Sequence, residues 1–163
     1  MADDRAYARH DLGDCSLVEP EYVGSPGRRT FRIYADGENG SALLWLEKEE
    51  LYELALAIKR MLRSSVRETG EPVVSASAAF KADFNCKVTA LSLGHDRRSG
   101  RYMILAQVSE EEDDAIAMWA DTEVMDWLAD RAFEVHDAGR ARCALCGGPM
   151  QRDGEAHACP RAN

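Results

Sequence analysis

Four residues near the C-terminus have the types and spacing of a metal site. Cys143 and Cys146 form a Cys-x2-Cys pair, and ten residues separate them from His157 and Cys159, a His-x-Cys pair. Two residues between cysteines let both sulfurs reach one ion across a tight turn, and Gly147 can adopt the positive φ that aims backbone N–H groups at the thiolates. Three soft thiolates and one imidazole complete a tetrahedron and favour zinc. The spacing therefore predicts a structural zinc ion, because a filled tetrahedron leaves no position for a substrate.

The same residues allow other interpretations. A Cys-x2-Cys pair also occurs in redox proteins, and the thiols could be unliganded. The tight His-x-Cys spacing leaves room for Asp153 or a water molecule in place of His157. If a metal binds, it would supply most of the folding free energy of a tail of about 25 residues with almost no apolar side chains.

The other candidate residues favour structural roles. Cys86 lies in a predicted strand, where a lone cysteine behaves as a small buried hydrophobe. Cys15 and His10 lie in a polar N-terminal stretch, and we expect no site there. His95 and Asp96 lie at a predicted hairpin tip, which favours a solvated turn over an acid–base pair. The sequence contains no phosphate-binding loop, dinucleotide glycine motif, nucleophile elbow or His-Glu-x-x-His motif. It therefore predicts no catalytic residue and no organic cofactor.

The first half of the chain predicts strands followed by a helix. A turn at residues 24–27 separates a strand over 17–23 from a hairpin formed by 29–34 and 41–46. From residue 47 apolar side chains recur at helical spacing, with acids in the first turn and bases near the last. This pattern predicts a helix over 48–65.

The second half predicts the same order of elements. Its strands and helix are expected at residues 84–93, 102–108, 115–120 and 122–138. Asp121 is a good N-cap for the helix, the segment 67–79 is a connector, and the acidic run 110–114 is a loop.

The two halves align as an internal repeat. The aligned pairs are Trp45 and Trp119, Glu47 and Asp121, Glu49 and Glu123, Leu51 and Met125, Leu54 and Leu128, and Ala55 and Ala129. The alternative is a chance match of two short junctions. A βββα unit cannot bury its own sheet face alone, so two copies would share one core. We therefore expect an α+β fold in which duplicated βββα units form a mostly antiparallel sheet, with two helices on one face and a small zinc-ribbon-like tail.

The expected domain organisation follows from this alignment. Residues 1–138 would form the duplicated body, with repeats at about 17–65 and 84–138, and residues 139–163 would form the zinc-binding tail.

Charge and hydropathy limit the classes of partner that the protein can have. The 163 residues include 20 Lys and Arg against 29 Asp and Glu, for a net charge of −9. Four arginines and two acids lie from residue 139 onward, so the rest of the chain has 16 basic and 27 acidic residues and carries −11. Such a body repels phosphate backbones, which disfavours nucleic acid as a partner.

The longest apolar run is only residues 42–46, and the first residues are polar, so we expect no membrane association and no signal peptide. An odd number of cysteines fits a reducing compartment, and we expect a cytoplasmic protein.

Several strings resemble one family. They are Gly-Ser-Pro-Gly-Arg-Arg-Thr-Phe at 24–31, Cys-x-x-Cys-Gly at 143–147 and His-Ala-Cys-Pro-Arg-Ala-Asn at 157–163. Together they resemble an uncharacterised, mainly actinobacterial family catalogued as domain of unknown function 3090, over residues from about Tyr22 to the last. The resemblance implies the cysteine site and the architecture, and it names no reaction.

These observations predict a cytoplasmic zinc-binding protein that acts as a protein-interaction adaptor or regulator, with a tail that docks on a partner. One alternative is an enzyme with a pocket between the repeats, which would use the charged residues Arg29, Glu47 and Lys48 at element ends. Another is nucleic-acid binding through the zinc tail, a common use of such tails. The sequence does not identify the partner.

Overall fold

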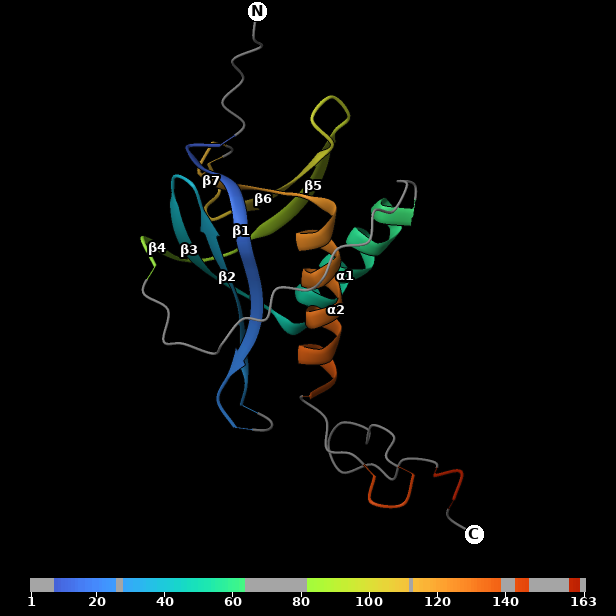
Figure 1. Cartoon of the computed structure of the whole chain (residues 1–163). Helices are drawn as coiled ribbons and strands as arrows, with labels where there is room; N and C mark the ends of the chain where they lie inside the picture. The colour runs from blue at the N-terminus through green and yellow to red at the C-terminus, as the bar shows by residue number, and fades with distance from the viewer. Residues whose placement is uncertain are drawn as a thin grey trace, which may run out of the picture.

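A computed structural model describes residues 8–25, 28–63, 82–111, 113–138, 143–146 and 159–161. Figure 1 shows a sheet with two helices together on one side of it, and the C-terminal segments beyond the end of the second helix. The elements in chain order are β1 (His10–Val23), β2 (Thr30–Gly37), β3 (Gly40–Leu46), α1 (Lys48–Arg63), β4 (Phe84–Lys87), β5 (Ala90–Asp96), β6 (Arg101–Gln107), β7 (Ala115–Ala120) and α2 (Thr122–Ala138). The predicted connector at 67–79 lies outside the described residues.

The strands form one mixed sheet in the order β4-β3-β2-β1-β7-β6-β5. The pairs β1–β2, β2–β3, β5–β6 and β6–β7 are antiparallel, whereas β1–β7 and β3–β4 are parallel. The fold is thus α+β with one mixed sheet, in which four of the six strand pairings among the described residues are antiparallel and two are parallel. For β3 and β4 the cause is α1, because a helical crossover returns the chain to the same end of the sheet and the two strands run in the same direction.

The first strand is longer than the sequence indicates. It begins at His10 rather than at residue 17, and its first part pairs with β7 while its later part pairs with β2. The pairing with β7 shifts register between Asp11 and Asp14, where Gly13 has a φ of +69°. This irregularity breaks the alternation of polar and apolar side chains, which is the sequence signal of a strand.

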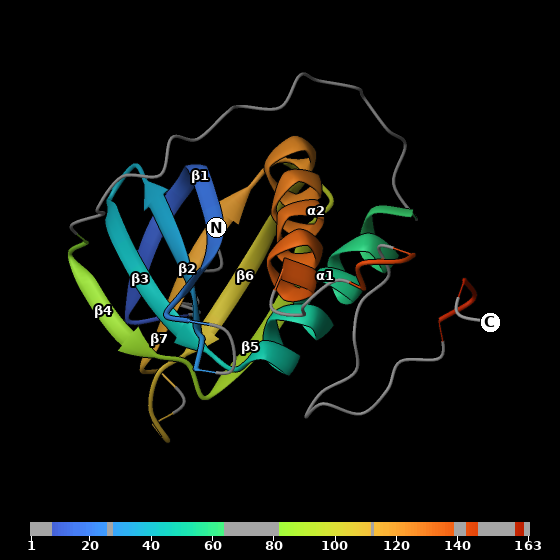
Figure 2. The ribbon, with the colours of Figure 1, turned by 90° about the horizontal axis from the view of Figure 1, so that it is seen from below.

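The predicted strand at 84–93 is two strands that lie at opposite edges of the sheet. β4 ends at Lys87 and β5 begins at Ala90. Between them, the Val88 N–H donates to Trp45 O over 2.8 Å, and the Thr89 N–H donates to Gln107 O over 2.8 Å. Since β3 and β6 supply these two carbonyls, two residues of chain join the two edges and the sheet must curl (Figure 2).

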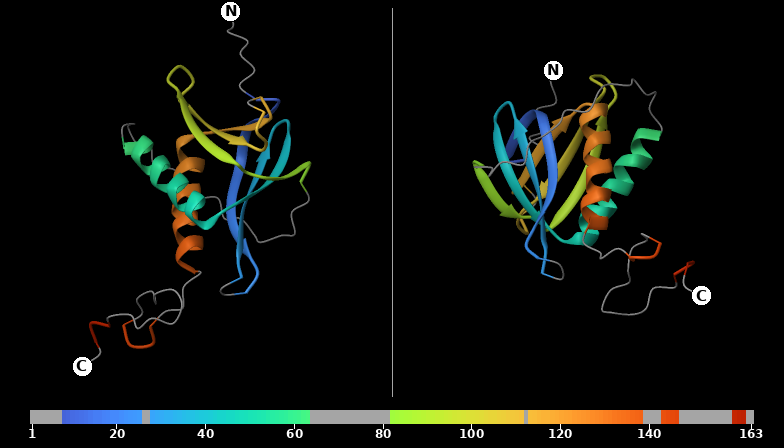
Figure 3. Two further views of the ribbon diagram at one scale, coloured as in Figure 1. Left: turned by 180° about the vertical axis from the view of Figure 1, so that it is seen from behind. Right: turned by 60° about the horizontal axis from the view of Figure 1, so that its bottom comes forward.

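Both helices lie on the same side of the curled sheet and contact each other (Figures 2 and 3). Lys59 of α1 places its Nζ 2.6 Å from a carboxylate oxygen of Asp126 and 2.6 Å from one of Asp130, both on α2. The apolar stripes of the two helices enter one core with the strands of both halves; their buried members are Leu51, Leu54, Ala55, Ile58 and Leu62 on α1, and Met125, Leu128, Ala129, Ala132 and Val135 on α2.

Helix α2 begins where the sequence predicts. Asp121 Oδ1 accepts a hydrogen bond from the Val124 N–H over 2.9 Å, which is the N-cap interaction expected of this residue. Among the described residues, neither helix combines the length and apolar composition that a bilayer span requires.

Candidate metal centre

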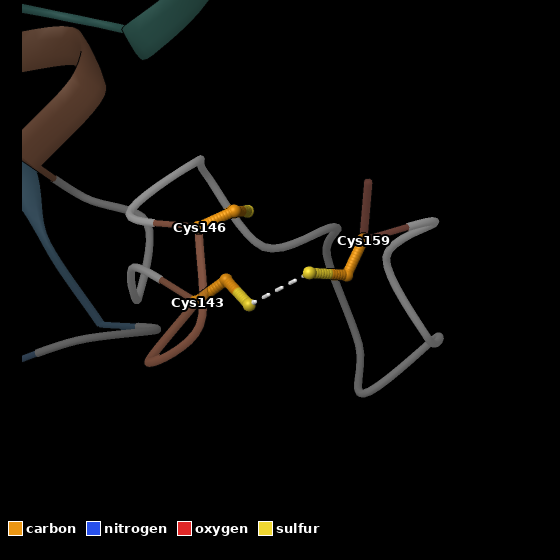
Figure 4. A group of neighbouring side chains, drawn as sticks. All are labelled: Cys143, Cys146 and Cys159. Atoms are coloured by element: carbon orange, nitrogen blue, oxygen red, sulfur yellow. Dashed lines mark hydrogen bonds between the residues drawn. The ribbon is translucent and has the colours of Figure 1, made fainter. Parts of the chain in front are cut away.

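Three cysteines from two chain segments come together after α2. The ligand atoms of Cys143, Cys146 and Cys159 all lie within 4.8 Å of one another, and Figure 4 shows their side chains directed towards a common centre. The segment 143–146 is a turn, so two residues suffice to bring its two sulfurs to one side. Cys159 returns to them from 16 positions beyond Cys143. Three side chains that could hold one metal ion are therefore assembled.

The separation of the sulfurs matches a shared ion better than a covalent bond. Cys143 Sγ and Cys159 Sγ lie 3.7 Å apart, and all five cysteines of the chain are free. A disulfide bond is about 2.05 Å long. Zinc–sulfur bonds of about 2.3 Å in a tetrahedron place two sulfurs about 3.8 Å apart. The observed distance fits one edge of such a tetrahedron.

The backbone of the turn favours the thiolate form of Cys143. The N–H groups of Cys146 and then Leu145 donate towards its sulfur, and they lower its pKa from 9.0 to about 6. Thiolates rather than thiols bind metal ions, so these two N–H groups prepare the site for a cation at neutral pH.

The second segment is attached to the first by Arg161, for which the sequence predicted no role at the site. Arg161 Nη1 donates to the carbonyl oxygen of Leu145 over 3.3 Å, so a hydrogen bond connects the two ligand-bearing segments. The Leu145 side chain itself is 58% exposed. Arg161 lies two residues after Cys159, within the string at 157–163 that carries the family resemblance.

His157, the fourth predicted ligand, lies outside the described residues, as does its alternative Asp153. The described part of the site is therefore a group of three thiols.

The remaining cysteines lie in the body. Cys15 is buried in β1, and burial raises the pKa of its thiol from 9.0 to about 12. Cys86 is half-buried in β4 and packs against the core, as expected of a small hydrophobe. His10 is not in a polar extension but at the start of β1, where its ring lies 4.5 Å from that of Phe84.

The hairpin tip after β5 is held as a turn. Asp96 accepts hydrogen bonds from the Arg98 N–H and from the Ser99 hydroxyl, and these bonds lower the pKa of its carboxyl group. The ring of His95 stacks on that of Tyr102, 4.3 Å away. These contacts give both residues structural roles.

Two of the charged residues considered for an enzyme pocket also have structural contacts. The Arg29 guanidinium lies 4.1 Å from the centre of the Tyr22 ring, and Glu47 lies 3.5 Å from Lys87 in an exposed ion pair. The Arg29 contact is that of a packed strand end, and the Glu47 contact is that of a solvated surface.

The cysteine cluster lies within a region shared with a known family. A family described as "Protein of unknown function (DUF3090)" matches residues 10–159. The chain belongs to this family. The match extends from the start of β1 to Cys159, so the DUF3090 region includes the whole sheet, both helices and all three clustered cysteines. No curated protein and no solved structure matches the chain.

Proposed function

We propose that the chain binds one structural zinc ion through Cys143, Cys146 and Cys159, and that the metal-bound tail docks on a protein partner, so that the protein acts as an adaptor or regulator. The observation that carries this proposal is the approach of three sulfurs to within 4.8 Å from two separate segments. The sulfurs supply soft ligands, which favour zinc over magnesium or calcium.

The proposed ion has a structural role. His157 is proposed as the fourth ligand, because its position two residues before Cys159 brings an imidazole to the same segment. Four protein ligands close the tetrahedron and exclude a substrate from the metal. Such a site stabilises the surrounding chain, since thiolate ligands repel one another without a cation between them.

The exposed apolar side chains support docking at the metal-bound end. Among the described residues, the exposed large hydrophobic side chains are Tyr22, Val23 and Leu145. Tyr22 and Val23 end β1, and Figures 1 and 3 place that end of the β1–β2 hairpin and the cysteine segments towards the same end of the molecule. Leu145 lies between two proposed ligands, so metal binding would fix its position. An acidic body would favour a partner with a basic patch.

We also propose that the body is a duplicated βββα scaffold. Support comes from two similar hydrogen bonds. One is made by a tryptophan of β3 and the other by a tryptophan of β7, and each reaches the parallel strand beside it. The Trp45 indole N–H donates to Asn85 Oδ1 over 2.7 Å, and the Trp119 indole N–H donates to Asp11 Oδ2 over 3.3 Å. Each tryptophan precedes its helix by the same number of residues, and each acceptor lies on the neighbouring parallel strand. A cytoplasmic location is part of this proposal, because a reducing compartment preserves free thiols.

Metal analysis of the purified protein tests the zinc site. We expect one zinc per chain, and we expect its loss in Cys143→Ser, Cys146→Ser and Cys159→Ser. Cys86→Ser is the matched control, since Cys86 lies in β4 away from the tail, and it should retain zinc. His157→Gln should weaken binding. Retention of zinc in the cysteine variants, or a Cys143–Cys159 disulfide in protein kept under reducing conditions, would contradict the proposal.

Docking requires a separate measurement. Affinity purification from native cytosol should recover a stoichiometric partner with the zinc-loaded protein, and recovery should fall with Leu145→Ser although its zinc content is unchanged. Ala90→Ser, at an exposed position of β5, is the control and should recover the partner. If Leu145→Ser and the metal-free protein each recover as much partner as the zinc-loaded wild type, the tail does not dock.

A further inference from the structure

We propose that Arg161 is a positioning residue of the metal centre, which holds the segment of Cys159 against the turn of Cys143 and Cys146. This inference rests on the proposed zinc site. Its direct observation is the hydrogen bond of 3.3 Å from Arg161 Nη1 to the carbonyl oxygen of Leu145. Arg161 follows Cys159 by two residues, and Leu145 immediately precedes Cys146. The bond therefore connects the two segments close to a ligand on each side.

Arg161 acts on the ligands through one backbone residue. The Leu145 carbonyl accepts from Arg161, while the Leu145 N–H donates towards the Cys143 sulfur. Fixing the carbonyl restrains the turn and hence the direction in which this N–H points. Groups that orient metal ligands in this way contribute to affinity without touching the metal, and their removal weakens binding by about 10-fold to 100-fold.

Charge gives Arg161 a second role at the same place. Three thiolates and one divalent ion leave a net charge of −1 if the fourth ligand is neutral. The positively charged guanidinium offsets this charge next to the site. This compensation of the negative charge at the metal centre matters more because the rest of the chain is itself strongly acidic.

The hydrogen bond also favours assembly before the metal arrives. Cys146 and Cys159 lie on segments that must meet, and closing the intervening loop has an entropic cost that grows with its length. A donor on one segment and an acceptor on the other lower this cost in the metal-free protein. Arg161 should therefore raise affinity mainly by organising the ligands in advance.

The test is a titration of the metal-free full chain with Zn²⁺ in competition with a chelator, and with Co²⁺, whose thiolate absorption reports the ligand set. Arg161→Ala should raise the dissociation constant by about 10-fold or more. Arg161→Lys retains the charge and one donor, and it should restore part of the affinity. At saturation the Co²⁺ spectrum should be that of the wild type, because no ligand is removed. Arg97→Gln, an exposed arginine in the turn after β5, is the control and should bind as the wild type does.

The outcomes separate this inference from the proposed function. Wild-type affinity in Arg161→Ala would overturn the role of Arg161 and leave the zinc site intact. Absence of binding in the wild type would overturn both. A changed Co²⁺ spectrum at saturation, or equally weak binding by Arg161→Lys and Arg161→Ala, would contradict a positioning role. Unchanged thermal unfolding of the body in each variant shows that any loss of affinity is local.

Discussion

Trp127 donates its indole N–H to a carboxylate oxygen of Glu19 over 3.1 Å, and this contact attaches α2 to β1. The contact lies in the part of β1 beyond Asp14, where the pairing with β7 has ended. Glu19 is only 8% exposed, and Arg131 of α2 places Nη2 3.5 Å from its other oxygen. A buried carboxylate thus accepts one hydrogen bond from, and forms one ion pair with, the helix that covers this stretch of the strand.

Replacing Glu19 should loosen this attachment. Glu19→Ala should lower the free energy of unfolding by about 2 kcal/mol, because it leaves Trp127 without its acceptor and Arg131 without its ion pair. Glu19→Gln should cost less, since its amide oxygen still accepts from the indole. Urea denaturation measures the change. Glu53→Gln, at an exposed position of α1, is the control, and an equal effect there would contradict the assigned role.

The two tryptophans that precede the helices should make equivalent contributions if the body is a duplication. Double-mutant cycles between Trp45→Phe and Asn85→Ala, and between Trp119→Phe and Asp11→Ala, should each give a coupling energy of about 1 kcal/mol. Chemical denaturation of the single and double variants provides the values. Coupling in one pair and none in the other would argue against equivalent halves.

Removing the N-cap of α2 should destabilise the body modestly. Asp121→Ala deprives the Val124 N–H of its acceptor and should lower the unfolding free energy by about 1 kcal/mol. Asp121→Asn retains a capping oxygen and should remain close to the wild type. Thermal unfolding monitored by circular dichroism distinguishes them, and identical destabilisation by both substitutions would exclude capping as the cause.

The buried Cys15 thiol should make stability depend on alkaline pH. Its pKa is raised to about 12 by burial, so above pH 9 the unfolded state loses the proton while the folded state keeps it. This contribution to stability is complete below pH 9 and is lost as the pH rises towards 12. Between pH 8 and 10.5 the wild type should lose about 2 kcal/mol more than Cys15→Ala. Parallel denaturation curves would disprove the thiol's part in the loss.

Metal removal should change which thiols react. In chelated protein, a disulfide reagent such as DTNB should modify Cys143, Cys146 and Cys159, which are half-buried as Cys86 is, whereas buried Cys15 should react only after unfolding. Zinc saturation should suppress the reactions of Cys143, Cys146 and Cys159. Mass spectrometry identifies the modified residues, and rapid reaction of all three in the zinc-saturated protein would contradict their shared coordination.

Local patterns in the sequence predicted the helices well. The apolar stripe and terminal charges placed the first helix at 48–65, and the structure has Lys48–Arg63. Asp121 and the stripe after it placed the second helix at the residues observed, Thr122–Ala138. These signals succeed because a helix is determined by side chains within a few residues of one another.

Strand neighbours were harder to predict. The pairing of Asp14 with Trp119 joins residues that are far apart in the chain, and the alternation of side chains carries no information about which strand lies beside which. The polar residues around Gly13 also concealed the first part of β1. The mixed character of the sheet could therefore not be read from periodicity.

For the candidate site too, the sequence predicted the local feature and missed the contact between distant segments. Two close cysteines and a third with a compatible spacing predicted a thiol cluster, and the structure places their sulfurs within 4.8 Å. The contact between Arg161 and Leu145 had no local signal, because one arginine among the charged residues of the tail is not distinctive. The contact depends on how the segments 143–146 and 159–161 lie in space, which the sequence does not state.

The parallel pairing of β1 with β7 can form only late in synthesis. Asp11 of β1 accepts a hydrogen bond from Trp119 of β7, which the ribosome adds 108 positions later. The edge of β1 that pairs with β7 therefore stays uncovered until nearly the whole body has been translated. A nascent or truncated chain that ends before β7 would display that edge to other chains and would be prone to aggregate. Completion of the last strand and helix is therefore the step that protects the newly made protein.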